Sequence, residues 1–347
     1  MKILIVKTSS LGDIIHTFPS LQLLRERYPS AQIDWVVEQP FTELVQSHPD
    51  IDHVFSVKTR QWRKNMSTRQ TWQEILTLRK ELRSVSYDRV YDFQGNFKSG
   101  LITWMAKSPI KVGFGFSSVP EKPNALFTNK HFNPPKGKNI RDDYLYLVDQ
   151  SGDYHVREVE LQISSQEQQR IDQFLANPVF QGGKKIMVCP GSMWANKQLS
   201  KETLLAFLQK IDQSETSRFL FVWGSDAEKQ TVQELALSFP ERCLIADKLP
   251  LATLQNLMGR MDQVIAMDSL PLHLAGTTST QVFGVFGASS ANKYKPAGSS
   301  AFQGACPYGR TFEKRCPILR TCPTGSCIKD VDPNVLFQNL LSISLDS

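Results

Sequence analysis

Short apolar runs alternate with longer amphipathic stretches along most of the chain, a pattern typical of parallel α/β sheets. In the first half, the hydrophobic pattern predicts strands at residues 3–7, 33–37, 53–57, 89–93 and 111–114. Helical spacing between them predicts helices at residues 14–28, 41–47, 71–84 and 97–106. The first half is therefore expected to be a doubly wound α/β domain.

The second half repeats the alternation. Strands are predicted at residues 185–189, 219–223, 243–246, 263–267 and 281–286, and helices at residues 201–213, 227–238, 251–259 and 270–276. A polar connection with one or two helices separates the two series. A chain of 347 residues suits two domains of ordinary size, so we expect domains at residues 1–160 and 161–347.

Residues 297–333 lack this periodicity and are rich in Gly, Pro, Cys and Arg. Four of the six cysteines fall here: Cys306, Cys316, Cys322 and Cys327. Clustered cysteines in a chain expected to be cytoplasmic favour a metal over disulfides, although the C-x2-C pairs of common zinc sites are missing. Two interpretations remain: a structural zinc site, or a loop in which the cysteines pack as small apolar groups.

The positive charge is unevenly distributed. Residues 1–150 hold 21 Lys and Arg against 15 Asp and Glu, an excess of six, whereas residues 151–347 hold 19 of each. This excess indicates either a solvated surface or an anionic partner, such as a phosphorylated substrate or an acidic lipid surface. No apolar run is long enough for a signal-peptide core or a membrane span, which predicts a cytoplasmic protein.

The turn after the first predicted strand, residues 7–13, ends in a carboxylate at the mouth of a helix. Ligands of open α/β sheets bind at such strand-to-helix turns. Asp13 at this place either interacts favourably with the helix N-terminus or acts as a general base toward a docked substrate.

Polar residues also follow three strands of the second series, and parallel strands bring such exits to one edge of a sheet. Glycine-bearing exits with a hydroxyl and a lysine can hold a diphosphate, and a carboxylate can accept hydrogen bonds from a ribose. The alternatives are structural roles: a solvated turn lysine, a glutamate in the first turn of a helix, an aspartate N-cap and a core histidine. The candidate residues are Ser192, Lys197, Gly224, Glu228, Asp268, Ser269 and His273.

Other motifs are set aside. The Gly113-Phe-Gly115 turn lacks the third glycine of a dinucleotide-binding fingerprint, and the chain has no Walker-type phosphate loop. The Asp50-Ile-Asp52 and Asp330-Val-Asp332 triplets do not end strands and are interpreted as acidic pairs of surface loops. No basic stripe interleaved with aromatic residues is present, which argues against a nucleic-acid partner.

Several motifs together resemble the ADP-heptose:lipopolysaccharide heptosyltransferases of glycosyltransferase family 9, and the opening is most similar to heptosyltransferase I. They are Lys7-Thr8-Ser9-Ser10-Leu11-Gly12-Asp13, His16-Thr17, Pro19, Asp34-Trp35-Val36-Val37-Glu38, Trp62-Arg63-Lys64, Gln94-Gly95 and Lys98-Ser99. The resemblance extends to about residue 298. It implies a GT-B fold, in which two Rossmann-like domains face each other across a cleft.

The resemblance also implies roles for residues. Asp13 matches the proposed catalytic base, Lys197 the lysine at the donor diphosphate, and Glu228 the acid near the adenosine ribose. Asp268 and His273 match the family's D-[ST]-G-x-x-H run, from which this chain departs with Leu270 in place of glycine. The acceptor side is implied to comprise Ser10, Gly12, Arg60, Arg63, Lys64 and Lys98.

The implied reaction is the inverting transfer of L-glycero-D-manno-heptose from ADP-heptose to the Kdo region of inner-core lipopolysaccharide, such as Kdo-lipid A, with no metal or other cofactor at the reacting centre. The enzyme would dock peripherally at the cytoplasmic face of the inner membrane. Two alternatives stay open. One is a related transferase with another acceptor, as in heptosyltransferase II, or another nucleotide-sugar donor. The other is a non-catalytic nucleotide- or lipid-binding protein on the same fold.

Overall fold

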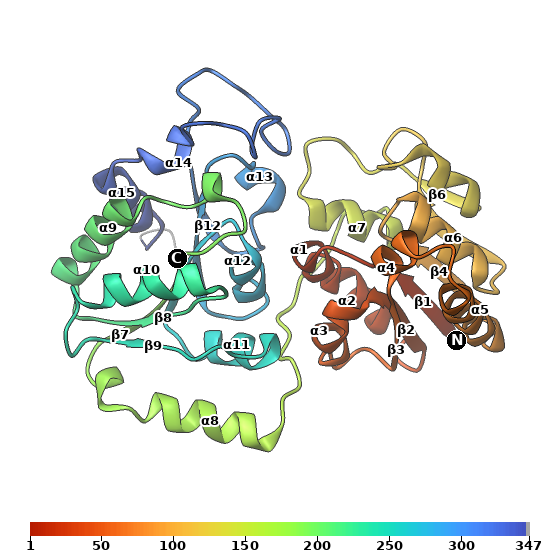
Figure 1. The fold of residues 1–347 in the computed structure, drawn as a ribbon, viewed down its shortest axis with the longest axis horizontal. Helices are drawn as coiled ribbons and strands as arrows, with labels where there is room; N and C mark the ends of the chain where they lie inside the picture. Colours follow the sequence, from red (N-terminus) through yellow and green to blue (C-terminus); the bar gives the residue numbers. More distant parts are fainter. Residues whose placement is uncertain (345–347) are drawn as a thin grey trace. The chain divides into compact units, whose positions relative to one another are not determined.

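The computed structural model describes residues 1–344 and divides the chain into two compact units, Met1–Arg157 (unit 1) and Glu158–Ser347 (unit 2) (Figure 1). Each unit is built around a six-stranded sheet in which every pairing between neighbouring strands is parallel. Because parallel strands need crossover connections, helices cover the sheets, and the central strands are buried on both faces while the edge strands are partly exposed. The α/β fold class predicted from the periodicity is confirmed.

In unit 1 the strand order is β3-β2-β1-β4-β5-β6. The strands are β1 (Lys2–Val6), β2 (Gln32–Glu38), β3 (His53–Val57), β4 (Arg89–Asp92), β5 (Ile110–Phe114) and β6 (Lys130–Phe132). The α-helices are α1 (Leu11–Ile15), α2 (Phe18–Arg27), α3 (Thr42–Gln46), α4 (Thr59–Lys64), α5 (Arg69–Ser84), α6 (Phe97–Met105) and α7 (Ile140–Val148). Only β6 among these strands was not predicted from the sequence.

Two helical layers enclose this sheet. On one face α4, α5 and α6 contribute Trp62, Leu78 and Ile102 to a core that includes Leu4 and Val6 of β1. On the other face α2 and α7 pack against each other and against aromatic side chains of the sheet. The alternation of side chains along each strand supplies both cores at once.

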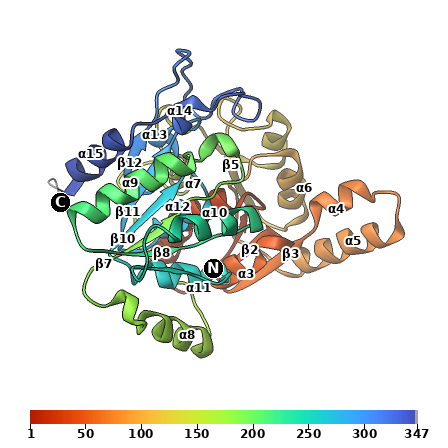
Figure 2. The same ribbon diagram turned by 60° about the vertical axis from the view of Figure 1, so that its left-hand side comes forward.

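Unit 2 has the strand order β12-β11-β10-β7-β8-β9. Its strands are β7 (Lys184–Cys189), β8 (Ser217–Phe221), β9 (Cys243–Ile245), β10 (Gln263–Met267), β11 (Gln281–Phe286) and β12 (Ser300–Gln303). Its α-helices are α8 (Ser165–Leu175), α9 (Lys201–Ser214), α10 (Asp226–Ala236), α11 (Leu251–Met258), α12 (Leu270–Ala275), α13 (Ala291–Tyr294), α14 (Ser326–Lys329) and α15 (Pro333–Ser344). The turned view in Figure 2 shows α9 and α15 side by side, in agreement with their contacts.

Both units share one topology. Counted from its first strand, each sheet has the order 3-2-1-4-5-6 of a dinucleotide-binding fold. The direction of chain progression reverses between the first and fourth strands. In unit 1 this switch point lies between β1 and β4, and in unit 2 between β7 and β10.

Two predicted elements differ from the structure. The helix expected over residues 14–28 is divided into α1 and α2, because Pro19 has no N–H to donate and the hydrogen bonds of the preceding turn end at Thr17. Residues 297–333, expected to be irregular, contain β12 and α14. Strand β12 was missed because its Ser-Ala-Phe-Gln sequence carries little hydrophobic signal and is held by pairing with β11.

Candidate functional site

The first candidate site lies at the switch point of unit 1. Asp13 is the third residue of α1, and its carboxylate accepts hydrogen bonds from the Ser10 hydroxyl at 2.7 Å and the Ser10 backbone N–H at 3.3 Å. Ser10 is exposed, whereas Gly12 and Asp13 are half-buried. The carboxylate therefore caps its own helix and still reaches the surface of the unit, which leaves both roles expected from the sequence open.

A buried lysine lies near this carboxylate. The Lys7 ammonium donates to the Tyr144 hydroxyl at 2.8 Å and to the Phe93 carbonyl at 3.2 Å. Burial lowers the pKa of Lys7, and the negative charges of Asp13 and Asp92 oppose that shift. A cation held at the end of β1 thus contributes a favourable potential at Asp13. Sequence reasoning placed Lys7 in the opening motif but gave it no role.

The end of β4 fixes the loop that carries Asp13. The Gln94 side-chain carbonyl accepts hydrogen bonds from the backbone N–H groups of Thr8 and Ser9, at 3.1 and 3.0 Å. The fully buried Asp92 accepts hydrogen bonds from the Gly95 N–H at 2.9 Å and from the Asn124 amide at 2.6 Å. Burial raises the pKa of Asp92, and these hydrogen bonds partly offset the effect. Hydrogen bonds thus link the loop after β1, which leads to Asp13, to the loop after β4.

The predicted acceptor-binding residues occupy two helices. Arg60, Arg63 and Lys64 are exposed on α4, where their spacing puts them on one face of the helix. Trp62 packs beneath them, and its indole N–H donates to Glu74 at 2.6 Å. Lys98 lies in the first turn of α6 and is half-buried. The structure therefore gathers three of the basic residues and places the fourth on a different helix.

The second candidate site lies at the switch point of unit 2. The buried Lys197 ammonium contacts the buried Asp268 carboxylate at 2.6 Å, and His273 Nε2 lies 3.8 Å from that carboxylate. Burial alone would raise the pKa of Asp268, but the charges of Lys197 and His273 lower it below its usual value. An ammonium has three donors, so Lys197 can hold Asp268 and still bind an anion.

Glu228 joins this site from the β8 side. Its carboxylate accepts a hydrogen bond from the Gly224 N–H at 2.7 Å and occupies the space that a side chain at Gly191 would need. Ser192, the next residue, is buried. Since β8 and β10 flank β7, the exits of all three strands meet around the β7–α9 loop. The expected gathering of these polar residues at one sheet edge is therefore present.

The β10–α12 turn departs from the expected pattern at one residue. Ser269 is the N-cap of α12, yet its hydroxyl donates to the Met267 carbonyl at 3.2 Å and caps no helix N–H. Leu270 is the first residue of α12 and is half-buried. A Cβ at this position restricts how closely a phosphate can approach the backbone.

The cysteine-rich segment packs against the same β7–α9 loop. Asn196, which the sequence analysis did not single out, donates to the carbonyls of Leu319 and Cys322, both at 2.9 Å. The Arg320 guanidinium lies 4.2 Å from the centre of the Trp194 ring. The segment therefore braces the residue next to Lys197. Only the tertiary structure reveals this, because more than 120 residues separate the partners.

The four clustered cysteines line one small pocket of unit 2. They are Cys306, Cys316, Cys322 and Cys327. Within residues 1–344, no three His, Cys, Asp or Glu side chains are grouped in a geometry that could hold a metal ion. The shared pocket agrees with the interpretation in which the cysteines pack as small apolar groups, and the zinc site stays a prediction.

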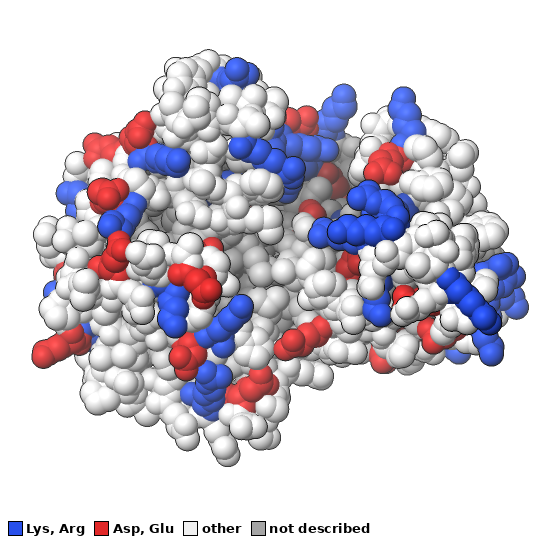
Figure 3. All heavy atoms as spheres, in the orientation of Figure 1, with Lys and Arg blue, Asp and Glu red and all other residues white. Residues whose placement is uncertain are grey.

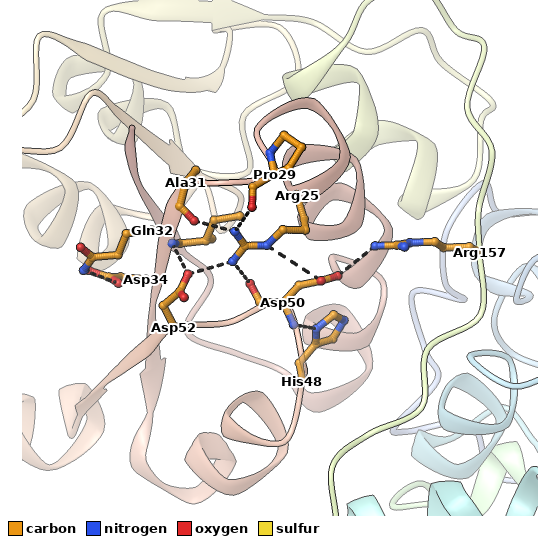
Figure 4. Close-up of polar contacts among 10 residues, drawn as sticks. Arg25, Pro29, Ala31, Gln32, Asp34, His48, Asp50, Asp52 and Arg157 are labelled. Carbon is orange, nitrogen blue, oxygen red and sulfur yellow. Dashed lines mark hydrogen bonds and ion pairs between the residues drawn. The ribbon is translucent and has the colours of Figure 1, made fainter.

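The carboxylates of the two Asp-x-Asp triplets have partners within the protein: Asp50 and Asp52 contact arginines outside their loop, and Asp332 contacts the next helix. Figure 4 shows Arg25 between Asp50 and Asp52: its guanidinium donates to the Asp52 carboxylate at 2.8 Å and lies 3.9 Å from that of Asp50. Arg157 contacts Asp50 from the end of the unit at 3.2 Å. In the second triplet, Asp332 accepts a hydrogen bond from the Asn334 N–H at the start of α15.

Comparison with known proteins identifies the family. A family model described as glycosyltransferase family 9 (heptosyltransferase) matches residues 75–319. The chain belongs to glycosyltransferase family 9. Lipopolysaccharide heptosyltransferase 1 of Pseudomonas aeruginosa is 29% identical over 296 residues, covering 83% of this chain and 79% of that protein. Lipopolysaccharide heptosyltransferase 1 of Escherichia coli K12 is 25% identical over 287 residues, covering 83% and 88%.

Solved structures of the family have the same fold. The E. coli heptosyltransferase WaaC with ADP covers 99% of this chain and 100% of its own, with a TM-score of 0.76 and 22% identity. E. coli ADP-heptose lps heptosyltransferase II has a TM-score of 0.72 at 18% identity, covering 100% and 99%. This family 9 enzyme is therefore a glycosyltransferase with the GT-B fold, as its sequence motifs implied.

Proposed function

We propose that this enzyme transfers L-glycero-D-manno-heptose from ADP-heptose to the Kdo region of inner-core lipopolysaccharide. The observation that supports this best is the position of Asp13 at the switch point of unit 1, the unit with all the excess positive charge. The lipopolysaccharide heptosyltransferase 1 proteins of two genera support the first heptose as the transferred residue. A cytoplasmic location follows from the proposed donor.

Unit 2 is the proposed donor domain. Lys197 would meet the diphosphate with the donors that Asp268 leaves available, and Asp268, which His273 also contacts, holds its ammonium in place. The backbone of the β7–α9 loop, including Ser192, supplies further N–H donors. Glu228 is proposed to accept hydrogen bonds from the ribose, next to Gly224. Ser269, the N-cap of α12, is proposed to be a further contact for the donor phosphates.

Unit 1 is the proposed acceptor domain, with Asp13 as general base. Asp13 would take the proton of an acceptor hydroxyl while that oxygen forms a bond to the anomeric carbon of heptose. The bond from that carbon to the phosphate oxygen breaks, and its electron pair leaves with ADP. Attack opposite the leaving group inverts the anomeric centre. Lys197 stabilises the charge that develops on ADP.

Basic residues of unit 1 are proposed to bind the acidic groups of the acceptor. Arg60, Arg63 and Lys64 form one exposed face of α4, which suits phosphates or sugar carboxylates. Lys98, in the first turn of α6, is proposed to bind a second anionic group of the acceptor. Ser10 and Gly12 border the carboxylate that would receive the proton.

A second candidate within the family is a transferase for a later acceptor or another donor. Leu270 at the start of α12 supports this second candidate, because it replaces the glycine of the family pattern beside the proposed donor phosphates. Lipopolysaccharide heptosyltransferase 3 of E. coli and lipooligosaccharide heptosyltransferase 2 of Campylobacter jejuni are both 21% identical to this chain. Kdo-lipid A and heptosylated Kdo-lipid A, offered in parallel with ADP-heptose, distinguish these acceptors.

The deciding experiment incubates the enzyme with ADP-heptose and Kdo-lipid A and measures the mass of the lipid product. We expect the addition of one heptose, with or without a chelator of divalent cations. Donor binding without any transfer, to either acceptor, would instead identify a non-catalytic nucleotide-binding protein. ADP-glucose in place of ADP-heptose tests whether Leu270 has changed the donor.

A further inference from the structure

Unit 1 exposes an unusual row of side chains along α5. Trp72 and Leu76 are 49% and 56% exposed. Arg79 and Arg83 continue the row at the spacing of a single helical stripe. The buried residues of the helix, Leu78 among them, lie on the stripe next to it. The row therefore faces outward from a helix whose other side packs into the core of unit 1.

Helix α6 extends this face. Helices α5 and α6 contact each other, and Trp104 of α6 is 53% exposed. The Arg79 guanidinium lies 5.5 Å from the centre of the Trp104 ring. The Lys111 ammonium donates to the Trp104 carbonyl at 3.3 Å, and Arg83 is close enough to influence Lys111 electrostatically. We call Trp72, Leu76, Arg79, Arg83, Trp104 and Lys111 the α5–α6 surface.

The composition of this surface matches one kind of partner. Indole rings and an aliphatic side chain flanked by Arg and Lys are typical of segments that lie in the headgroup region of a membrane. The acidic residues of α5, Glu74 and Glu81, lie about 200° around the helix from Leu76 and Arg79, off the stripe. Figure 3 shows Lys and Arg side chains gathered over α5 at the edge of unit 1.

We propose that the α5–α6 surface docks this enzyme on a bilayer that contains anionic lipids. The basic side chains meet the negative headgroups, while the indoles and Leu76 enter the interface between headgroups and acyl chains. The proposal rests on the proposed function, since an acylated acceptor resides in such a membrane. A second copy of the chain fits less well, because a symmetric contact would oppose Arg79 and Arg83 to themselves.

None of the helices within residues 1–344 combines the length and the apolar character that a membrane span requires. A peripheral contact of this kind needs none. Each Lys or Arg near an anionic surface contributes about 1 kcal/mol, or roughly fivefold in binding. The apolar side chains add a component that does not depend on lipid charge.

The test measures sedimentation of the full-length enzyme with vesicles of phosphatidylglycerol and phosphatidylethanolamine, and with vesicles of phosphatidylcholine alone. We expect the Arg79→Gln/Arg83→Gln variant to lose about 25-fold in binding to the anionic vesicles, from two charges. The Trp72→Ser/Leu76→Ser variant should lose about tenfold or more on the same vesicles.

The matched controls are Leu237→Ser, at a residue of unit 2 that is 82% exposed, and Lys248→Gln, also in unit 2. Both should bind the anionic vesicles as the unmodified enzyme does. Brominated phospholipids provide an independent signal, since they should quench less tryptophan fluorescence in Trp104→Phe than in the unmodified enzyme. Vesicle binding unchanged in the α5 variants, or a dimer that dissociates in them, would overturn the proposal.

Transfer assays separate this proposal from the proposed function. With a deacylated, water-soluble Kdo acceptor, the α5 variants should keep the kcat and KM of the unmodified enzyme. With Kdo-lipid A in anionic vesicles, their apparent KM should rise by about the factor lost in binding. If transfer fails with both acceptors while vesicle binding still depends on these residues, the proposed function is wrong and the docking surface stands.

Discussion

The switch points of the two units share one strand topology but place their charges differently. In unit 1 the carboxylate of Asp13 is half-buried and held by its own N-cap residue, and the buried cation Lys7 is hydrogen-bonded to neutral oxygens. In unit 2 the carboxylate of Asp268 is buried and in direct contact with Lys197. A proton acceptor has to meet its substrate, whereas an anion-binding lysine has to be held in place. The difference in burial agrees with the two proposed roles.

The main ion-pair network of unit 1 lies away from its candidate site. Arg25, Asp50, Asp52 and Arg157 connect the end of α2 to the start of β3 (Figure 4). In unit 2 the buried ion pair belongs to the site itself. We therefore expect stability and activity to be separable in unit 1 and coupled in unit 2.

The largest effect is expected for Asp13→Asn. Losing the general base should lower kcat by about 10²–10⁴-fold. Binding of ADP, measured by calorimetry, and the free energy of unfolding should change little, because asparagine can still accept from Ser10. The matched control Asp142→Asn, in the first turn of α7, should leave kcat unchanged. Undiminished transfer by Asp13→Asn would refute its catalytic role.

Asp268→Asn should affect both properties of unit 2. Removing the carboxylate leaves Lys197 buried without its counter-ion, which costs about 3–5 kcal/mol in the free energy of unfolding. ADP should also bind more weakly, because the ammonium is no longer held. The double variant Lys197→Met/Asp268→Asn should recover much of the stability but not the ADP affinity. A single variant as stable as the unmodified enzyme would contradict the proposed coupling.

Arg25→Met should lower the free energy of unfolding by about 2–3 kcal/mol, through lost hydrogen bonds to carboxylate and carbonyl oxygens. Transfer measured below the unfolding temperature should be unaffected. The control Lys136→Met changes an exposed cation of the same unit and should leave stability unchanged. A loss of kcat in the folded Arg25→Met variant would show that stability and activity are coupled in unit 1 as well.

The pH dependence of stability should be visible in unit 1 through His48. Burial, aided by the charge of Arg157, lowers the pKa of His48 from 6.5 to about 3. The unfolded chain then binds the extra proton between these values, so stability falls as the pH drops below 6.5, by about 1.4 kcal/mol per pH unit. His48→Asn should flatten this slope in chemical denaturation series. The same substitution at the exposed His53 should not.

The smallest effect is expected at the cysteine pocket. If its four thiols hold zinc, the enzyme purified without chelators should carry about one zinc ion per chain, measured by atomic emission. The Cys316→Ser/Cys322→Ser variant should lose the metal and show a KM for ADP-heptose raised only a few-fold, because this segment acts on Lys197 indirectly, through the neighbouring residue Asn196. Metal-free enzyme with four titratable thiols would favour the apolar packing interpretation.

Periodicity was sufficient to predict ten of the twelve strands near their observed positions, since buried parallel strands read as continuous apolar runs. The missed strands β6 and β12 are short edge strands, which are specified by the neighbours that they pair with. The prediction of one helix over residues 14–28 was wrong. The apolar pattern continues through Thr17, but Pro19 has no N–H to donate, so one helix ends and the next begins there.

The sequence by itself determined the fold class, the family and the residue types at each strand exit, because these depend on local patterns and on motifs of adjacent residues. The tertiary structure decided which exits meet. It joined Thr8 and Ser9 to Gln94, Lys197 to Asp268, and Asn196 to the cysteine segment. Strand order fixes such contacts, and it is not encoded in the spacing of residues along the chain. Likewise, only the packing of α5 against α6 brings Trp104 beside Arg79.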